Sequence, residues 1–123
     1  MDDASKDSVV SIDQQQEKRP SLADTLPAFA TELRQLLEEQ GESELAAQVS
    51  SLRIFEPCRC GDDIRATFYT QPKPDGAYGF GHRNVPLMPE DGMLILDVVA
   101  QEIACVEVLD RPDVREKLDS ALP

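Results

Sequence analysis

The sequence is poor in bases, in histidine and in long apolar runs, and each shortage narrows the classes of protein that it can encode. Its 123 residues hold 12 Lys and Arg against 24 Asp and Glu, so the formal net charge is −12 at pH 7. Nucleic acids and anionic membranes repel such a charge, so we expect neither as a direct partner. The longest apolar stretch, Met93 to Ala100, contains Asp97 and is far too short to span a bilayer.

Two further absences concern targeting and disulfides. The first twenty residues lack the apolar run of a secretory signal, so we expect a cytoplasmic protein. The three cysteines are an odd number, which does not favour a disulfide framework.

The length and the hydrophobic fraction of 41% suit one domain with its own core. Residues 1–20 are polar and contain three consecutive glutamines, so they predict a flexible tail. Residues 21–123 are then expected to form a single domain.

Residues 21–51 predict two helices that pair as a helical hairpin, because apolar residues recur there at helical spacing. We expect Ser21 to cap the first helix, and Pro27 to delay or kink its main part. Gly41 should end it, and Ser43 should cap the second helix.

Residues 53–109 predict two hairpins separated by a loop. The first turns at Gly61-Asp62, which places Ile54 opposite Tyr69 and Glu56 opposite Thr67, with Phe55 on the core side. The second turns around 100–102 and places Val99 opposite Ile103 and Asp97 opposite Cys105.

The segment between these hairpins, residues 71–92, holds four prolines and four glycines, which indicates an ordered loop or a short edge strand. Pro112 should start a closing helix with Asp110 as its cap. Together these elements predict an α+β fold with an N-terminal helical hairpin, a mostly antiparallel four- to five-stranded sheet and a C-terminal helix.

Strand alternation in the second hairpin puts Leu94, Leu96, Val98, Ala104, Val106 and Val108 on the core face. The opposite face of the sheet then carries Cys58, Cys60, Arg65, Tyr69, Asp97, Cys105 and Glu107. Asp97 and Glu107 are diagonal neighbours there, so they can act as an acid and base pair near Arg65. Alternatively they are simply solvated, or paired with arginine.

The three cysteines also suggest a zinc site. Cys58, Cys60 and Cys105 share the non-core face with one histidine, His82, within reach, and thiolates with an imidazole suit zinc. The C-x-C spacing is shorter than the usual zinc spacing, so the strand would need a bend. The alternatives are thiols packed beside the core, or a Cys–His nucleophile pair.

The stretch from residue 76 to 83 is a candidate binding loop. Glycines let its backbone approach a partner, Tyr78 and Phe80 offer stacking surfaces, and His82 and Arg83 offer charge. It matches neither a dinucleotide-binding motif nor a P-loop. In the alternative interpretation its aromatic rings pack on the sheet and Arg83 pairs with an acid.

The acids of the helical segment suggest the function. Glu38, Glu39, Glu42 and Glu44 either form a solvated face or attract a basic protein partner. With no catalytic motif, the chain is interpreted as a non-enzymatic immunity or inhibitor protein for a basic toxin or nuclease. This interpretation requires no cofactor.

One alternative is a small metal- or ligand-binding protein, enzymatic or not, that uses Cys58, Cys60, Cys105 and His82 to hold zinc or uses Asp97 and Glu107 with Arg65. Another is an assembly subunit that uses its sheet edge or its tail.

The strings CRCGDD and FYT, then DGAYGFGHRNV, then DGMLILDVVAQEIACVEVLDR resemble a small bacterial domain family. The resemblance covers roughly residues 56–112. It implies a small α+β protein and no established activity, so it transfers no functional residue.

Overall fold

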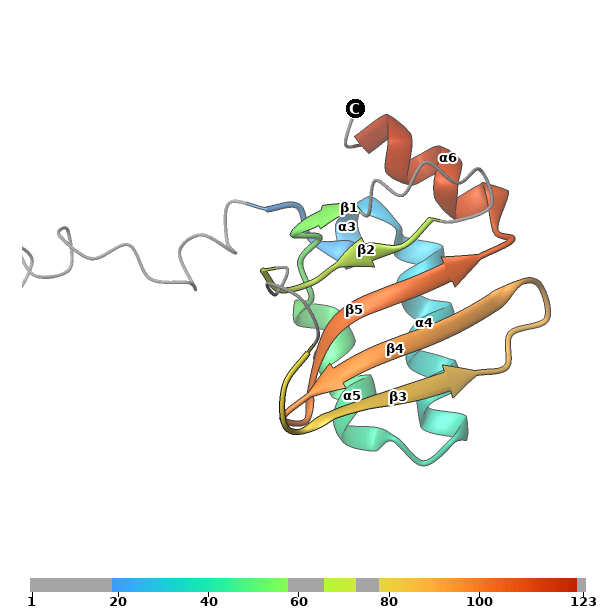
Figure 1. The fold of residues 1–123 in the computed structure, drawn as a ribbon. Coiled ribbons are helices and arrows are strands. Elements are labelled where there is room, and N and C mark those ends of the chain that lie inside the picture. The colour runs from blue at the N-terminus through green and yellow to red at the C-terminus, as the bar shows by residue number, and fades with distance from the viewer. Residues whose placement is uncertain (1–18, 58–65, 73–77, 122–123) are drawn as a thin grey trace, which may run out of the picture.

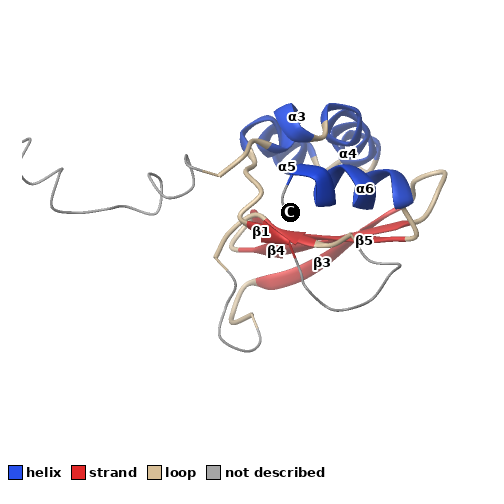
Figure 2. Cartoon of the chain, turned by 90° about the horizontal axis from the view of Figure 1, so that it is seen from above, coloured by secondary structure: helices blue, strands red, loops and turns tan. Residues whose placement is uncertain are grey.

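The computed structural model describes residues 19–57, 66–72 and 78–121, and these form two layers. Helices cover one face of a five-stranded antiparallel sheet with strand order β1-β2-β5-β4-β3 (Figure 1, Figure 2). The strands are β1 (Glu56–Pro57), β2 (Phe68–Tyr69), β3 (His82–Leu87), β4 (Met93–Val99) and β5 (Glu102–Leu109). The helices are α3 (Leu22–Thr25), α4 (Pro27–Glu39), α5 (Ser43–Gln48), the 3₁₀ turn η1 (Val49–Ser51) and α6 (Pro112–Ala121). The predicted α+β fold is confirmed.

The first part of the helical segment begins at its predicted cap, Ser21, and ends at the predicted Gly41. The Asp24 amide donates to the Ser21 hydroxyl oxygen at 3.4 Å, and Pro27 is the first residue of α4. Beyond α4, Gly41 has a φ of +80°, and its amide donates to the Glu38 carbonyl while the Glu42 amide donates to the Leu37 carbonyl. These two bonds make a Schellman motif. The predicted cap of α5 is wrong by one residue, because Ser43 is already helical and Glu42 precedes it.

Two glycines with positive φ offer a matched pair of substitutions. A Cβ at Gly41 meets open space, whereas one at Gly92 lies 2.5 Å from the Leu109 carbonyl oxygen. We expect Gly41→Ala to lower the free energy of unfolding by about 1 kcal/mol, and Gly92→Ala by about 2 kcal/mol or more. Urea denaturation followed by circular dichroism measures both losses. Equal losses would contradict the steric part of this prediction.

The core lies between the helices and the sheet. The apolar stripe of α4, which includes Phe29, Leu33 and Leu37, is buried against strand residues of the predicted core face. Phe29 meets Phe68 edge to face, with ring centroids 6.3 Å apart. Such rings stabilise a core through both burial and their edge-to-face geometry. Helical spacing in the sequence therefore identified the buried side of α4.

The β4–β5 hairpin has a tighter turn than predicted. Ala100 and Gln101 both have positive φ, so Val99 pairs with Glu102 instead of Ile103. An irregularity between Asp97 and Val98 then restores the predicted pairing of Asp97 with Cys105. The bulge moves Ile103 opposite Val98, and Ile103 joins the core cluster in place of Ala104. A bulge adds one residue to one strand, which alternation alone does not reveal.

The β1–β2 pairing is offset by two residues from the prediction. Glu56 pairs with Tyr69, and Pro57 with Phe68, so Ile54 is not in the ladder. Ile54 is fully buried in the core, whereas Phe55 is half-buried with the Arg19 guanidinium 4.2 Å from its ring centre. Phe55 was therefore wrongly assigned to the core. The predicted Gly61-Asp62 turn lies outside the described residues, as does the predicted tail apart from Arg19 and Pro20.

The proline-rich segment contributes β3, an edge strand, which confirms the second of its two predicted forms. Pro112 opens α6, but the predicted Asp110 cap is wrong. Asp110 has a φ of +57°, and the Arg111 carbonyl accepts the first helical bond from the Arg115 amide. No helix among the described residues has the length and apolar character needed to cross a bilayer.

Candidate functional site

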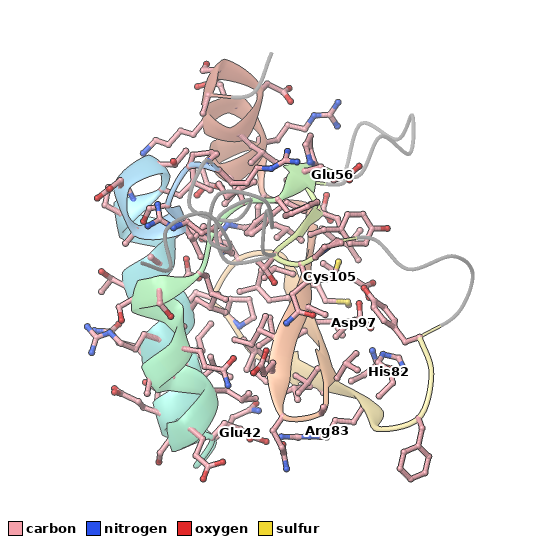
Figure 3. The ribbon with its side chains drawn as sticks, turned by 90° about the vertical axis from the view of Figure 1, so that its left-hand side faces the viewer. Glu42, Glu56, His82, Arg83, Asp97 and Cys105 are labelled. Atoms are coloured by element: carbon pink, nitrogen blue, oxygen red, sulfur yellow. The ribbon has the colours of Figure 1, made fainter. Side chains whose placement is uncertain are left out.

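A row of side chains crosses the sheet in register, one from each strand. Glu56 pairs with Tyr69, Tyr69 with Cys105, Cys105 with Asp97, and Asp97 with Asn84. Figure 3 shows Cys105 and Asp97 on the side of the sheet that faces away from the helices. The sequence correctly placed Asp97, Cys105 and Tyr69 on this outer face. Because β3 pairs with β4, the row also includes Asn84 from the proline-rich segment, residues 71–92.

Asp97 interacts with two other side chains of this face. Its Oδ1 lies 2.8 Å from His82 Nε2 and accepts a bond from Asn84 Nδ2 at 2.7 Å. The Asp97 side chain is 8% exposed and that of His82 is 28% exposed. A carboxylate that holds one ring nitrogen fixes the orientation of the histidine and leaves the other nitrogen for a ligand or a proton. The His82–Asp97 pair is therefore a preorganised polar site at the sheet surface.

Cys105 lies next to this pair and is buried. Its residue is 3% exposed, and burial raises the pKa of its thiol well above the usual range, with further increases from the charges of Asp97 and Glu107. A protonated thiol is a poor nucleophile, whereas a bound metal ion would itself deprotonate the thiol. Cys105 is thus held in the form that the packed-thiol interpretation expects.

Tyr78 covers the row from the loop before β3. Its ring lies 4.8 Å from the His82 ring at an angle of 32°, and its hydroxyl is hydrogen-bonded with Cys105. Burial is the main cause that raises the pKa of this hydroxyl, followed by the charge of Cys105. The interpretation in which loop aromatics pack on the sheet is correct for Tyr78.

We expect Cys105 to be slow to react in the folded chain. In a Cys58→Ser/Cys60→Ser background it is the one remaining thiol, and its reaction with a disulfide reagent near pH 8 should be at least about tenfold slower than in urea. Absorbance of the released thiolate measures both rates. Similar rates in the two solutions would show that the thiol is accessible and ionised.

Arg83 and Glu42 are brought together, away from the row. The guanidinium donates two bonds to the Glu42 carboxylate, each 3.1 Å long, and so ties β3 to the turn between α4 and α5 (Figure 3). This hydrogen bonding lowers the pKa of Glu42 and raises that of Arg83. Of the two interpretations of Arg83, the structure has the one in which it pairs with an acid. The carboxylate of Glu42 is therefore already paired within the chain, with Arg83.

Phe80 behaves differently from Tyr78. Its relative exposure is 103%, so the ring has no packing partner in the described part of the chain. Gly79 precedes it, and Gly81, with a φ of +88°, follows it. The predicted binding loop therefore separates into one packed aromatic ring and one fully exposed ring.

The remaining predicted ligands are only partly described. Cys58, Cys60 and Arg65 lie outside the described residues, so the zinc site and the Arg65 contact stay predictions. Within the described ranges no three His, Cys, Asp or Glu side chains form a metal-sized group. Glu107 pairs in register with Ile95 and so lies diagonally from Asp97. The charges of both carboxylates raise the pKa of the Cys105 thiol.

Sequence reasoning missed Asn84, although its signal was present. Asn84 is two residues from His82, so strand alternation puts both on the same face. It also missed Arg111, whose role depends on contacts across 79 residues of sequence.

Comparison of the chain with protein-family models, with curated proteins and with solved structures found no match.

Proposed function

We propose that this chain is a non-enzymatic, cytoplasmic binding protein that recognises a basic protein partner, as immunity and inhibitor proteins do. The observation that carries the proposal is the surface around the α4–α5 turn, which we call the acidic turn: Glu38, Glu39, Glu42 and Glu44. Residues 21–51 hold six acids and one base, Arg34. Glu38, Glu39 and Glu44 are exposed on this surface. Clustered surface carboxylates accelerate and orient association with a cationic protein.

The acidic turn is also rigid, which supports a binding role. The Schellman motif fixes the end of α4, and the bidentate Arg83–Glu42 pair fixes the start of α5 against β3. A surface that is already ordered loses less conformational entropy when it binds. The acids are therefore presented from a backbone that is held at two points.

Affinity capture from the source cells tests the proposal. The wild-type chain should retain a basic protein at low salt and release it at about 1 M salt, where exposed charges more than ~3 Å apart are screened. Glu38→Lys/Glu39→Lys/Glu44→Lys should capture at least about tenfold less. A matched variant with the same net charge, Asp24→Lys/Glu116→Lys/Asp119→Lys, changes exposed acids away from the acidic turn and should capture as the wild type does. Recovery of no basic protein, or equal loss in both variants, would overturn the proposal.

A second candidate is small-ligand or metal binding at the outer face, and the His82–Asp97 pair favours it. A buried carboxylate that holds a half-exposed histidine is a common support for a ligand or a metal ion. Elemental analysis of the purified chain tests the metal form. Less than about a tenth of an equivalent of zinc would remove it.

A further inference from the structure

Among the described residues, no strand pairs with the outer edge of β3. β3 is the last strand of the sheet, and Figure 1 shows its lower edge without a neighbouring strand. The Ala100 amide donates to the Gly81 carbonyl at 3.2 Å, so the ladder to β4 continues through residues 83, 85 and 87. The backbone groups of His82, Asn84 and Pro86 then point away from β4. Such an edge is a template for an added strand.

The acidic turn lies along the helix side of this same edge. Figure 1 shows the α4–α5 turn extending past β3, and the Arg83–Glu42 pair joins the two. Within the described residues Glu38 is paired with Arg34 at 3.7 Å and Glu42 with Arg83. A strand added beside β3 would therefore run next to the α4–α5 turn, on which Glu39 and Glu44 are both exposed.

Exposed apolar side chains lie beyond both ends of β3. Phe80 and Met88 have relative exposures of 103% and 81%, and they are two of the three large apolar residues found exposed in the described residues. Each is four positions from Asn84 in the sequence. A segment that pairs along β3 and continues past both of its ends could cover both, since the eight steps from residue 80 to residue 88 span at most about 26 Å, the length of an eight-residue strand.

We propose that the basic partner binds by strand addition: an extended segment of it pairs with the outer edge of β3, its basic side chains facing the acidic turn. This inference rests on the proposed function and specifies the partner segment. The segment receives amide bonds from His82 and Asn84 but none from Pro86, which has no N–H. Because side chains alternate along a strand, basic residues are required at every second position.

Charge decides against a second copy of this chain as the occupant. Two copies paired edge to edge would bring their acidic turns to the same side of the joined sheet. Like charges at that separation repel, and the chain already carries −12. A basic segment gains attraction from the same geometry.

The test uses a synthetic peptide of about eight residues with alternating Lys and Val as the probe. Titration into the isotopically labelled full chain should shift the backbone amide resonances of His82 and Asn84. Asn84→Pro and Asn84→Ala both lose the side-chain bond to Asp97, but only the proline removes the edge amide. We expect Asn84→Pro to weaken binding at least about tenfold relative to Asn84→Ala.

The outcomes separate this inference from the function on which it rests. If both Asn84 variants bind equally while Glu38→Lys/Glu39→Lys/Glu44→Lys does not, strand addition is wrong and charge-dependent binding stands. If no variant changes binding, or the peptide does not bind, the inference fails. Dimers of the free chain that Asn84→Pro abolishes would make a second copy the occupant and would also overturn it.

A folding control keeps the test decisive. Circular dichroism establishes whether Asn84→Pro is folded. If it is not, Phe80→Glu/Met88→Glu should weaken peptide binding at least about tenfold. Met93→Glu, at a half-exposed apolar residue of β4, should leave binding unchanged. Equal binding by these two variants would overturn the proposal.

Discussion

Arg111→Met should lower the free energy of unfolding by about 3 kcal/mol. The Arg111 guanidinium is 9% exposed and donates to the Glu32 carboxylate at 2.9 and 2.7 Å and to that of Asp113 at 3.0 Å twice. It also lies 5.8 Å from the centre of the Phe29 ring. One side chain thus connects α4, the end of β5 and α6.

The loss of stability comes from the charge and the hydrogen bonds of Arg111. Methionine is a similar unbranched side chain, so the substitution removes the charge and the hydrogen bonds with little loss of volume. Glu32 and Asp113 then remain near each other without their shared cation. Their side chains are 30% and 60% exposed, so water compensates in part, and the expected loss is at the low end of that for a broken buried pair.

The matched control is Arg34→Met. Arg34 and Glu38 form an exposed pair 3.7 Å apart on α4, and its removal should change the free energy of unfolding by less than about 0.5 kcal/mol. Urea denaturation followed by circular dichroism compares the two variants. If Arg111→Met is as stable as Arg34→Met, the cluster does not stabilise the fold.

Acid should reduce the difference between wild type and Arg111→Met. Hydrogen bonding to Arg111 lowers the pKa of Asp113 from its ordinary 3.8. A carboxyl with a depressed folded-state pKa contributes stability that is present above the unfolded pKa and is lost as the pH falls below it. The gap between the two denaturation curves should therefore narrow below about pH 4.

Cys105→Ser should make the chain less sensitive to alkali. Because the pKa of the Cys105 thiol is raised above its ordinary 9.0, the folded chain keeps a proton that the unfolded chain releases. The stability linked to this proton is complete below pH 9 and is lost as the pH rises, at up to about 1.4 kcal/mol per pH unit. About two units of alkali therefore remove up to roughly 3 kcal/mol.

Replacement by serine removes the ionisable thiol and keeps a side chain of similar size at position 105. Its hydroxyl does not ionise in this range, and it can replace the thiol in the bonds with Tyr78 and Asp97. Urea denaturation at intervals from about pH 8 to about pH 11 gives the slope for each chain in reducing buffer. Tyr78→Phe in the Cys105→Ser background should flatten the slope further, because burial also raises the pKa of Tyr78. Parallel slopes for wild type and Cys105→Ser would contradict the prediction.

Local sequence patterns encode the ends of α4 in this chain, but they do not encode the register defects between its strands. Helical spacing, Pro27 and Gly41 predicted the bounds of α4, because caps and breakers act within a few residues. The pairing of Asp97 with Cys105 was correct, although the turn that produced it was not, since a tighter turn and a bulge cancel. Register defects of this kind depend on packing between strands, which one strand's pattern does not contain.

The candidate site was predictable only in its parts. Alternation placed Asp97 and Cys105 on the outer face, but the partner of His82 is 15 residues away and that of Arg83 is 41 residues away. Side-chain partners across such separations follow from strand order. The proline-rich segment allowed both a loop and a strand, and only the strand brings His82 and Asn84 to Asp97.

The tight turn at Ala100 and Gln101 also has a consequence for the order of folding. It joins β4 to β5 with the shortest connection in the sheet, and β3 precedes β4 by a short loop, so these three strands close small loops. Short loops cost little chain entropy and form in microseconds. The helical layer, in contrast, meets the sheet through contacts between residues far apart in the sequence, such as those of α5 with β5. We expect the β3–β4–β5 meander to be the folding nucleus and the helical layer to dock afterwards, so that destabilising substitutions in α4 accelerate unfolding more than they slow folding.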